Sequence, residues 1–149
     1  MRHIYRCPLR WSDMDAYGHV NNAIFLRYLE EARIDFTSLR GAESKQGSVV
    51  ARHEIDYRRQ LVHRPTPVDI ELWITEIRAA SFTVSYEVKD ADAIYVTART
   101  VVVPFDFEAQ RPRRLTAGER EFLQQYTDRD DGSHDDSHDD SADEEAVAA

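Results

Sequence analysis

Hydrophobic and polar residues alternate with a two-residue period along most of the chain after Gly47, which is the pattern of half-buried β strands. Residues 93–105 are β-branched and aromatic almost throughout, which is typical of a central strand. The connections at residues 78–81 and 89–93 have hairpin length, so the pattern predicts a mainly antiparallel sheet. The positions on the apolar phase of the other runs are Val49, Ala51, His53, Ile55, Tyr57, Val68, Ile70, Leu72, Ile74, Phe82, Val84, Tyr86 and Val88.

The N-terminal segment alternates in the same way, with Tyr5, Cys7, Leu9 and Trp11 on its apolar phase. It therefore predicts one more strand, which brings the expected sheet to about five strands. Pro8 lacks a backbone N–H, so this first strand is expected at an edge of the sheet or at a bulge.

Between these strands, apolar residues recur at spacings of three and four, the period of an amphipathic helix. The pattern predicts a long helix from about Asn22 to Arg40, ended by the glycine that follows. Thr116, with Glu119 three residues later, resembles a capping box and predicts a short last helix to about Tyr126. The apolar stripe of the long helix comprises Phe25, Leu29, Ala32, Phe36 and Leu39.

One strand, one long helix and four further strands indicate an α+β fold, in which a single antiparallel sheet wraps around one helix. One helix covers only one face of such a sheet. The other face, or an edge, would leave apolar surface in water unless a second subunit covered it. We therefore expect at least a homodimer.

Composition bounds the class of protein. The chain has 149 residues, is 42% hydrophobic and contains no apolar run near the ~18 residues of a membrane helix, so one soluble domain without a membrane segment is expected. The N-terminus lacks the continuous apolar stretch of a secretory signal, so we expect a cytoplasmic location. Cys7 is the sole cysteine, which excludes an internal disulfide and a cysteine zinc motif.

The net charge of −9 comes from the C-terminus, because residues 128–149 hold ten acids against one arginine. Residues 1–127 hold 18 acids and 18 bases. We predict a folded domain of residues 1–127 and a disordered acidic tail of residues 128–149. The Ser-His-Asp-Asp repeats of the tail favour solvation over metal binding, since no fixed geometry holds the ligands. No metal site is therefore expected, and because the tail would repel phosphates, no nucleic-acid partner is expected either.

Polar residues crowd the loop that leads to the long helix, among them Asp13, Asp15 and His19. Unpaired backbone N–H groups and the positive end of the helix dipole at this position favour an oxyanion. Asn21 or Asn22 would serve as the N-cap. Capping explains one asparagine but not the acids. An acid near a helix N-terminus is also common electrostatics, so the spacing alone leaves a catalytic and a structural role open.

Three stretches of the chain carry a resemblance to a known family. WSDMDAYGHVNN (11–22), followed by YLEEAR (28–33), resembles the signature of the hotdog-fold acyl-CoA thioesterases of the 4-hydroxybenzoyl-CoA thioesterase-like family. The similarity continues through EIDYRRQLVHRPTPVDIELWITEI (54–77) and extends over residues 2–126. The resemblance implies the hotdog fold, assembly as a homodimer or homotetramer with active sites between subunits, and hydrolysis of an acyl-CoA to free acid and CoA.

The resemblance also implies roles for single residues. Asp15 matches the catalytic carboxylate of the family and would act as a general base or as the nucleophile. The backbone N–H that polarises the thioester carbonyl would fall at about Asn22. His19 would either orient Asp15 or the thioester oxygen, or brace the loop. Asp13 is expected to shape the loop through bonds to its backbone.

A second segment resembles the part of the family that lines the CoA site. It contains Tyr57, Arg58, Arg59 and His63, and guanidinium groups suit the phosphates of CoA. The two arginines are equally compatible with a solvated sheet edge. The chain departs from the family pattern at Gln60, where the family often has proline.

Other functions of the same fold stay open at this point. Asp15 and His19 are four residues apart and would also suit the acid–base pair of a hotdog acyl-CoA hydratase or dehydratase. A non-catalytic acyl-CoA-binding module is a further alternative. An acyl carrier protein would serve as well as CoA as the thiol carrier. No cofactor is expected, because coenzyme A is part of the substrate.

Overall fold

A computed structural model describes residues 1–41 and 46–128 of the chain. The acidic tail predicted for residues 128–149 lies outside the described residues, apart from Asp128. The elements in chain order are β1 (His3–Cys7), a 3₁₀ turn (Trp11–Asp13), α1 (Asn22–Ser38), β2 (Ser48–Tyr57), β3 (Val68–Ile77), β4 (Phe82–Lys89), β5 (Ile94–Asp106), β6 (Arg111–Pro112) and α2 (Ala117–Gln125).

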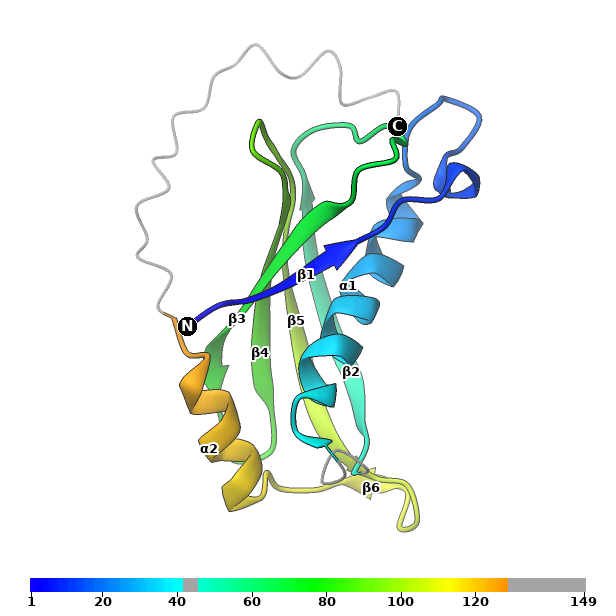
Figure 1. The fold of residues 1–149 in the computed structure, drawn as a ribbon. Helices are drawn as coiled ribbons and strands as arrows, with labels where there is room; N and C mark the ends of the chain where they lie inside the picture. The colour runs from blue at the N-terminus through cyan, green and yellow to red at the C-terminus, as the bar shows by residue number, and fades with distance from the viewer. Residues whose placement is uncertain (42–45, 129–149) are drawn as a thin grey trace.

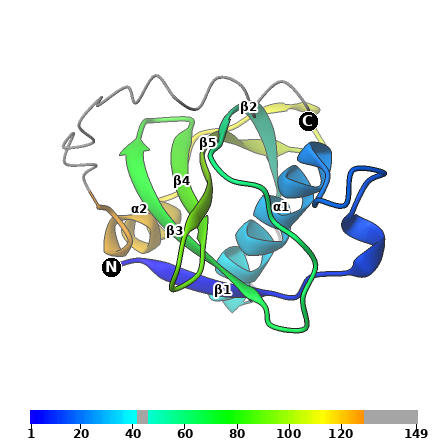
Figure 2. The same cartoon turned by 90° about the horizontal axis from the view of Figure 1, so that it is seen from above.

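The strands form one antiparallel sheet in the order β1-β3-β4-β5-β2, and the short β6 pairs with β5. The sheet curves around α1, with β1 and β2 as its edges (Figures 1 and 2). This arrangement confirms the α+β hotdog fold expected from the sequence. The edge position of β1 agrees with the proline that follows it.

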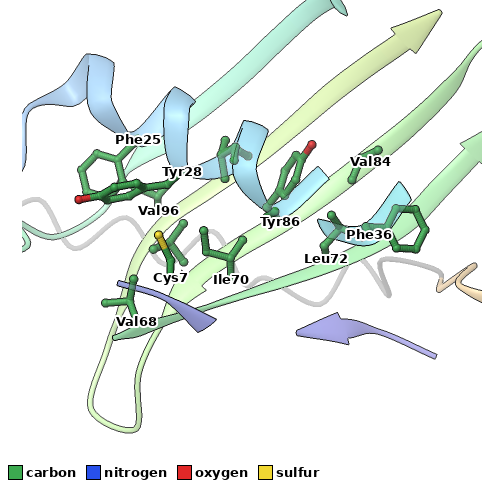
Figure 3. Close-up of a cluster of buried hydrophobic side chains, with 14 of the residues drawn as sticks. Cys7, Phe25, Tyr28, Phe36, Val68, Ile70, Leu72, Val84, Tyr86 and Val96 are labelled. Atoms are coloured by element: carbon green, nitrogen blue, oxygen red, sulfur yellow. The ribbon is translucent and has the colours of Figure 1, made fainter. Parts of the chain in front are cut away.

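The core lies between α1 and the concave face of the sheet (Figure 3). The residues of α1 that face the sheet recur at helical spacing, and each fully buried apolar side chain contributes about 1.5–3 kcal/mol. This packing holds α1 against β1 and β3 and so fixes the position of its N-terminus. The buried residues of α1 are Phe25, Tyr28, Leu29, Ala32 and Phe36, and those facing them include Ile70, Leu72, Val84, Tyr86 and Val96.

Two predictions from the two-residue period were wrong. β1 ends at Cys7, and Trp11 lies beyond it in the 3₁₀ turn with 75% of its surface exposed. In β2 a bulge shifts the register between Val50 and Arg52. Val50 pairs with the buried Val102, so it is Val50, rather than Val49 or Ala51, that shares the concave face.

The helix ends follow their capping residues. α1 begins at Asn22 as predicted but ends at Ser38, two residues before the predicted end. α2 begins after Thr116, whose side chain accepts from the Glu119 N–H while the Glu119 carboxylate accepts from the Thr116 N–H, so the capping box is confirmed. Its last turn leads to Asp128, whose N–H donates to the carbonyl of Ile74 on β3.

Candidate active site

The polar loop before α1 and the connection between β2 and β3 lie at the same end of the molecule (Figure 1). The Val20 N–H donates to the Leu61 carbonyl at 2.7 Å, which joins the two segments. The Tyr57 hydroxyl donates to the Asn22 carbonyl at 2.8 Å, and the Tyr57 ring meets that of Phe25 edge to face at 5.8 Å. Two segments far apart in sequence thus meet at the N-terminus of α1.

The N-terminus of α1 keeps one free backbone donor. Asn21 is the N-cap: its side-chain oxygen accepts from the Ala23 N–H at 2.9 Å, and its carbonyl accepts from the Ile24 N–H at 3.0 Å. The Asn22 N–H has no acceptor among the described residues. This donor, at the positive end of a 17-residue helix, is a suitable place for an oxygen that becomes negative.

The Asp15 carboxylate is held within the loop next to this donor. One oxygen accepts from the Tyr17 N–H at 2.9 Å and the other from the Asn21 side-chain amide at 3.2 Å. The Asp15 N–H donates to the His19 carbonyl at 2.9 Å, and Gly18, at φ +79°, closes the turn by donating to the Asp15 carbonyl. Because Asn21 also caps α1, one side chain sets the position of the carboxylate relative to the free helix donor.

Asp13 braces the same loop from the other side. One of its oxygens accepts from the Arg10 N–H at 3.0 Å and from the Tyr28 hydroxyl at 2.6 Å. Burial of Tyr28 and its bond to Asp13 raise the pKa of its hydroxyl. These contacts fit the loop-shaping role expected for Asp13, and they tie the loop to the middle of α1.

His19 contributes to the loop through its backbone. Its carbonyl accepts from the Asp15 N–H, while its half-buried ring has no hydrogen bond to any described residue. Its side chain, four residues after Asp15, therefore makes no hydrogen bond to the Asp15 carboxylate among the described residues.

The residues after Tyr57 are held by β5 through their backbone. The N–H groups of Arg58 and Arg59 both donate to the Tyr95 carbonyl, at 2.9 and 3.2 Å. The Arg58 side chain donates to the Thr97 hydroxyl at 3.2 Å, and Arg59 is exposed. His63 is half-buried and makes no side-chain hydrogen bond within the described residues. The structure thus brings Tyr57 to the helix end, whereas these three residues make no bond to Asp15 or Asn22.

Sequence reasoning missed two contributions to the loop. It predicts Asn21 only as a cap, although the Asn21 amide also binds Asp15, and it assigns no role to the Tyr28 hydroxyl. A signal for Tyr28 was present, because it stands on the buried stripe of the helix beside Phe25 and Leu29 and needs a partner for its hydroxyl.

Neither a metal site nor a membrane helix is found in the described part of the chain. Residues 1–41 and 46–128 contain no cluster of three or more His, Cys, Asp or Glu side chains that could hold a metal ion. No helix among them has the length and apolar character needed to cross a membrane.

Known proteins share this sequence and fold. The model of the thioesterase-like superfamily matches residues 9–125. A thioesterase from Thermus thermophilus, complexed with coenzyme A and Zn, is 28% identical with a TM-score of 0.74, covering 83% of this chain and 92% of its own. A candidate acyl-CoA thioesterase from Xanthomonas campestris is 32% identical with a TM-score of 0.62, covering 73% of this chain and 95% of its own.

A third structure supports the fold alone. A predicted thioesterase from Bacillus stearothermophilus has a TM-score of 0.79 at 23% identity, covering 87% of this chain and 98% of its own. No curated protein matches the chain. Since the family model spans most of the chain, this protein belongs to the thioesterase-like superfamily and is a hotdog-fold thioester hydrolase.

Proposed function

We propose that this protein hydrolyses acyl-CoA thioesters, with Asp15 as the catalytic carboxylate and the Asn22 N–H as the donor to the oxyanion. The observation that carries the proposal is the free N–H of Asn22 at the end of α1, a helix packed against the sheet by one face, and its link through Asn21 to the Asp15 carboxylate. Thioester hydrolysis needs a base or nucleophile and a preorganised donor, and this loop offers one of each.

The proposed reaction has a defined balance of bonds and protons. As general base, Asp15 takes a proton from a water whose oxygen attacks the thioester carbon. The carbonyl oxygen becomes negative and accepts from Asn22. Collapse of this intermediate breaks the C–S bond, and the CoA sulfur leaves with the proton. As nucleophile, Asp15 would instead attack the thioester carbon, and the C–S bond would break to form a mixed anhydride and release the CoA thiolate. Water would then hydrolyse the anhydride, which returns Asp15 and the free acid, and a proton from this water would go to the thiolate. The proposal includes both routes, and neither uses a metal or a cofactor.

The CoA part of the substrate is assigned to the segment after β2. Arg58 and Arg59 are exposed and follow Tyr57, which contacts the helix end, so they would meet the phosphates together with Tyr57 and His63. The T. thermophilus thioesterase supports the choice of carrier, because it is complexed with coenzyme A. An acyl carrier protein thioester would present the same pantetheine arm, so it remains a second form of the substrate. The expected cytoplasmic location belongs to this proposal.

We also propose that the active form is a homodimer or homotetramer. β2 is an edge strand, and its concave-face residues Val50 and Tyr57 are 41% and 47% exposed in a single chain. An unpaired edge with apolar side chains is a surface that a second copy would cover. Because Tyr57 also touches the N-terminus of α1, such an interface would adjoin the proposed site.

The experiment that tests the function is thiol release from a panel of acyl-CoAs, from acetyl to palmitoyl and including aromatic acyl groups. A thioesterase liberates free thiol from at least one of them with multiple turnovers. A hydratase would instead change the absorbance of an enoyl-CoA without releasing thiol, and a binding module would do neither. Absence of thiol release across both the CoA panel and the matching acyl carrier protein thioesters would refute the proposal.

A further inference from the structure

A cavity of about 170 Å³ lies at the opposite end of α1 from the candidate active site. Its described lining comes from the end of α1, the start of β2 with the two residues before it, single residues of β4 and β5, the segment before α2, and α2 itself. The 17 residues of α1 place it about 25 Å from Asn22, at a rise of ~1.5 Å per residue. The residues that matter here are Phe36, Arg40, Phe82, Arg113, Glu119 and Phe122.

The cavity lining contains the carboxylate of Glu119, which already accepts several hydrogen bonds. Glu119 is 6% exposed and accepts from both terminal nitrogens of Arg113, at 2.8 and 2.9 Å, and from the Thr116 N–H at 2.9 Å. Burial alone would raise the pKa of Glu119, but the bonds from Arg113 and Thr116 lower it. Glu119 is therefore ionised and neutralises one arginine, which is Arg113.

Arg40 supplies the charge that remains. Its side chain is 14% exposed, and its one contact with an acid among the described residues is a long one, 3.4 Å from Nη1 to a Glu119 oxygen that Arg113 already occupies. The buried Nε of Arg113 has no acceptor among the described residues. Among the described residues that line the cavity, two guanidinium groups face one carboxylate, and Asp106, outside the lining, adds a further attraction to Arg113. The described lining itself therefore carries one net positive charge and unused donors, an arrangement that favours an anion.

Aromatic rings from three elements also line the cavity, and one of them, Phe122, lies on α2 beside Glu119. The rings of Phe36 and Phe122 lie 5.0 Å apart in a tilted arrangement, and Phe82 lines the same cavity from β4. The Arg40 guanidinium lies over the Phe122 ring, 5.9 Å from its centre. The aromatic ring of a ligand bound in this cavity would make the offset and edge contacts with these phenylalanines that phenyl groups prefer.

We propose that this cavity binds a small aromatic carboxylate of the size of benzoate, with the carboxylate on Arg40 and the ring among the three phenylalanines. The size is suitable, since an apolar protein cavity of about 150 Å³ holds a benzene molecule. The site neither uses Asp15 nor depends on the proposed thioesterase activity. A bound ligand would contact both the end of α1 and α2, at the opposite end of α1 from Asn22.

The test is a titration of the full-length, ¹⁵N-labelled protein with sodium benzoate, followed by amide chemical shifts. Benzoate should bind with a Kd on the order of 1 mM, as expected for a ligand of its size, and shift the amides of Thr37, Arg40 and Ser48. Acetate lacks the ring and benzyl alcohol lacks the charge, so each should bind at least about ten times more weakly.

Three variants separate the charge from the shape of the cavity. Arg40→Gln should weaken benzoate binding by about tenfold or more, because it removes the unneutralised guanidinium. Arg27→Gln, which changes an exposed arginine of α1 outside the cavity, should bind like the wild type. Thr37→Met should abolish binding by filling the space while leaving both arginines in place. Melting curves show whether each variant is folded.

The proposal is overturned if benzyl alcohol binds as tightly as benzoate, or if folded Arg40→Gln keeps the wild-type affinity. It is also overturned if the shifts gather around Asn22 instead of the cavity, or if benzoate at about 20-fold the expected Kd shifts nothing. None of these results bears on thiol release, so the failure of this site and the failure of the proposed function are distinguishable.

Discussion

The bond between Asp13 and Tyr28 allows a quantitative test of how the loop before α1 is held. Replacing Asp13 with Ala removes the acceptor of the Tyr28 hydroxyl, at 2.6 Å, and of the Arg10 N–H, at 3.0 Å. A hydrogen bond to a charged group contributes about 1.5–3 kcal/mol, and a buried hydroxyl left without a partner adds to the loss. Since Tyr28 is 3% exposed, its hydroxyl gains little from solvent. We expect Asp13→Ala to lower the free energy of unfolding by about 2–4 kcal/mol.

A double-mutant cycle isolates the contribution of this bond. Tyr28→Phe removes the donor and should cost about 1–2 kcal/mol by itself. In the Tyr28→Phe background, Asp13→Ala should cost only the bond to Arg10, so the two changes together should cost about 1–2 kcal/mol less than the sum of the single changes. Urea unfolding of the four proteins measures these energies. If the effects add to within about 0.5 kcal/mol, the bond does not brace the loop and this reasoning is wrong.

Three further outcomes are expected. Glu119→Gln should lower the free energy of unfolding by about 3 kcal/mol near neutral pH. Because the pKa of Glu119 is lowered in the folded protein, this loss of stability is complete above the unfolded pKa of ~4.3 and shrinks as the pH falls through the folded pKa, which thermal melts across that range will show. A chain ending at Asp128 keeps the bond from Arg2 at 2.6 Å and should retain the melting temperature and kcat/KM of the full chain, whereas loss of either would assign a structural role to residues 129–149. Sedimentation at micromolar concentration should show no monomer, because the unpaired edge strand β2 exposes the apolar side chains of Val50 and Tyr57, and a fully active monomer would contradict the shared interface.

The periodicity of the chain predicted the order and type of its elements, because burial of one face gives a strand a two-residue repeat of apolar positions and a helix a repeat of three to four residues. It failed where one residue changes the repeat. The bulge at Val50 and Arg52 moves part of β2 to the other face, and nothing local marks it. Trp11 continued the alternation by chance, although the strand had already ended at Cys7.

The site was predictable to the level of the loop but not to the level of its contacts. Asp15 and the Asn22 N–H lie close together in the sequence, so the family resemblance could point to both, and their catalytic roles stay predictions. The Asn21 amide donates to Asp15 and the Tyr28 hydroxyl donates to Asp13. These pairings depend on the shape of the loop and on how α1 packs, so they could not be predicted from the sequence. The cavity at the other end of α1 was not predictable, because Arg40 and Glu119 are 79 residues apart and meet only in the fold.

The most direct test of the proposed function is kcat for Asp15→Asn on the best acyl-CoA of the panel. The change keeps the side-chain volume and an oxygen for the Tyr17 N–H, but removes the charge that must take a proton or attack the carbonyl. As general base, Asp15 should give a fall in kcat of ~10²–10⁴, equivalent to about 3–5 kcal/mol of transition-state stabilisation, and as nucleophile a larger one. A folded oligomer of Asp15→Asn that keeps more than about a third of the wild-type kcat would contradict the assignment of the catalytic carboxylate.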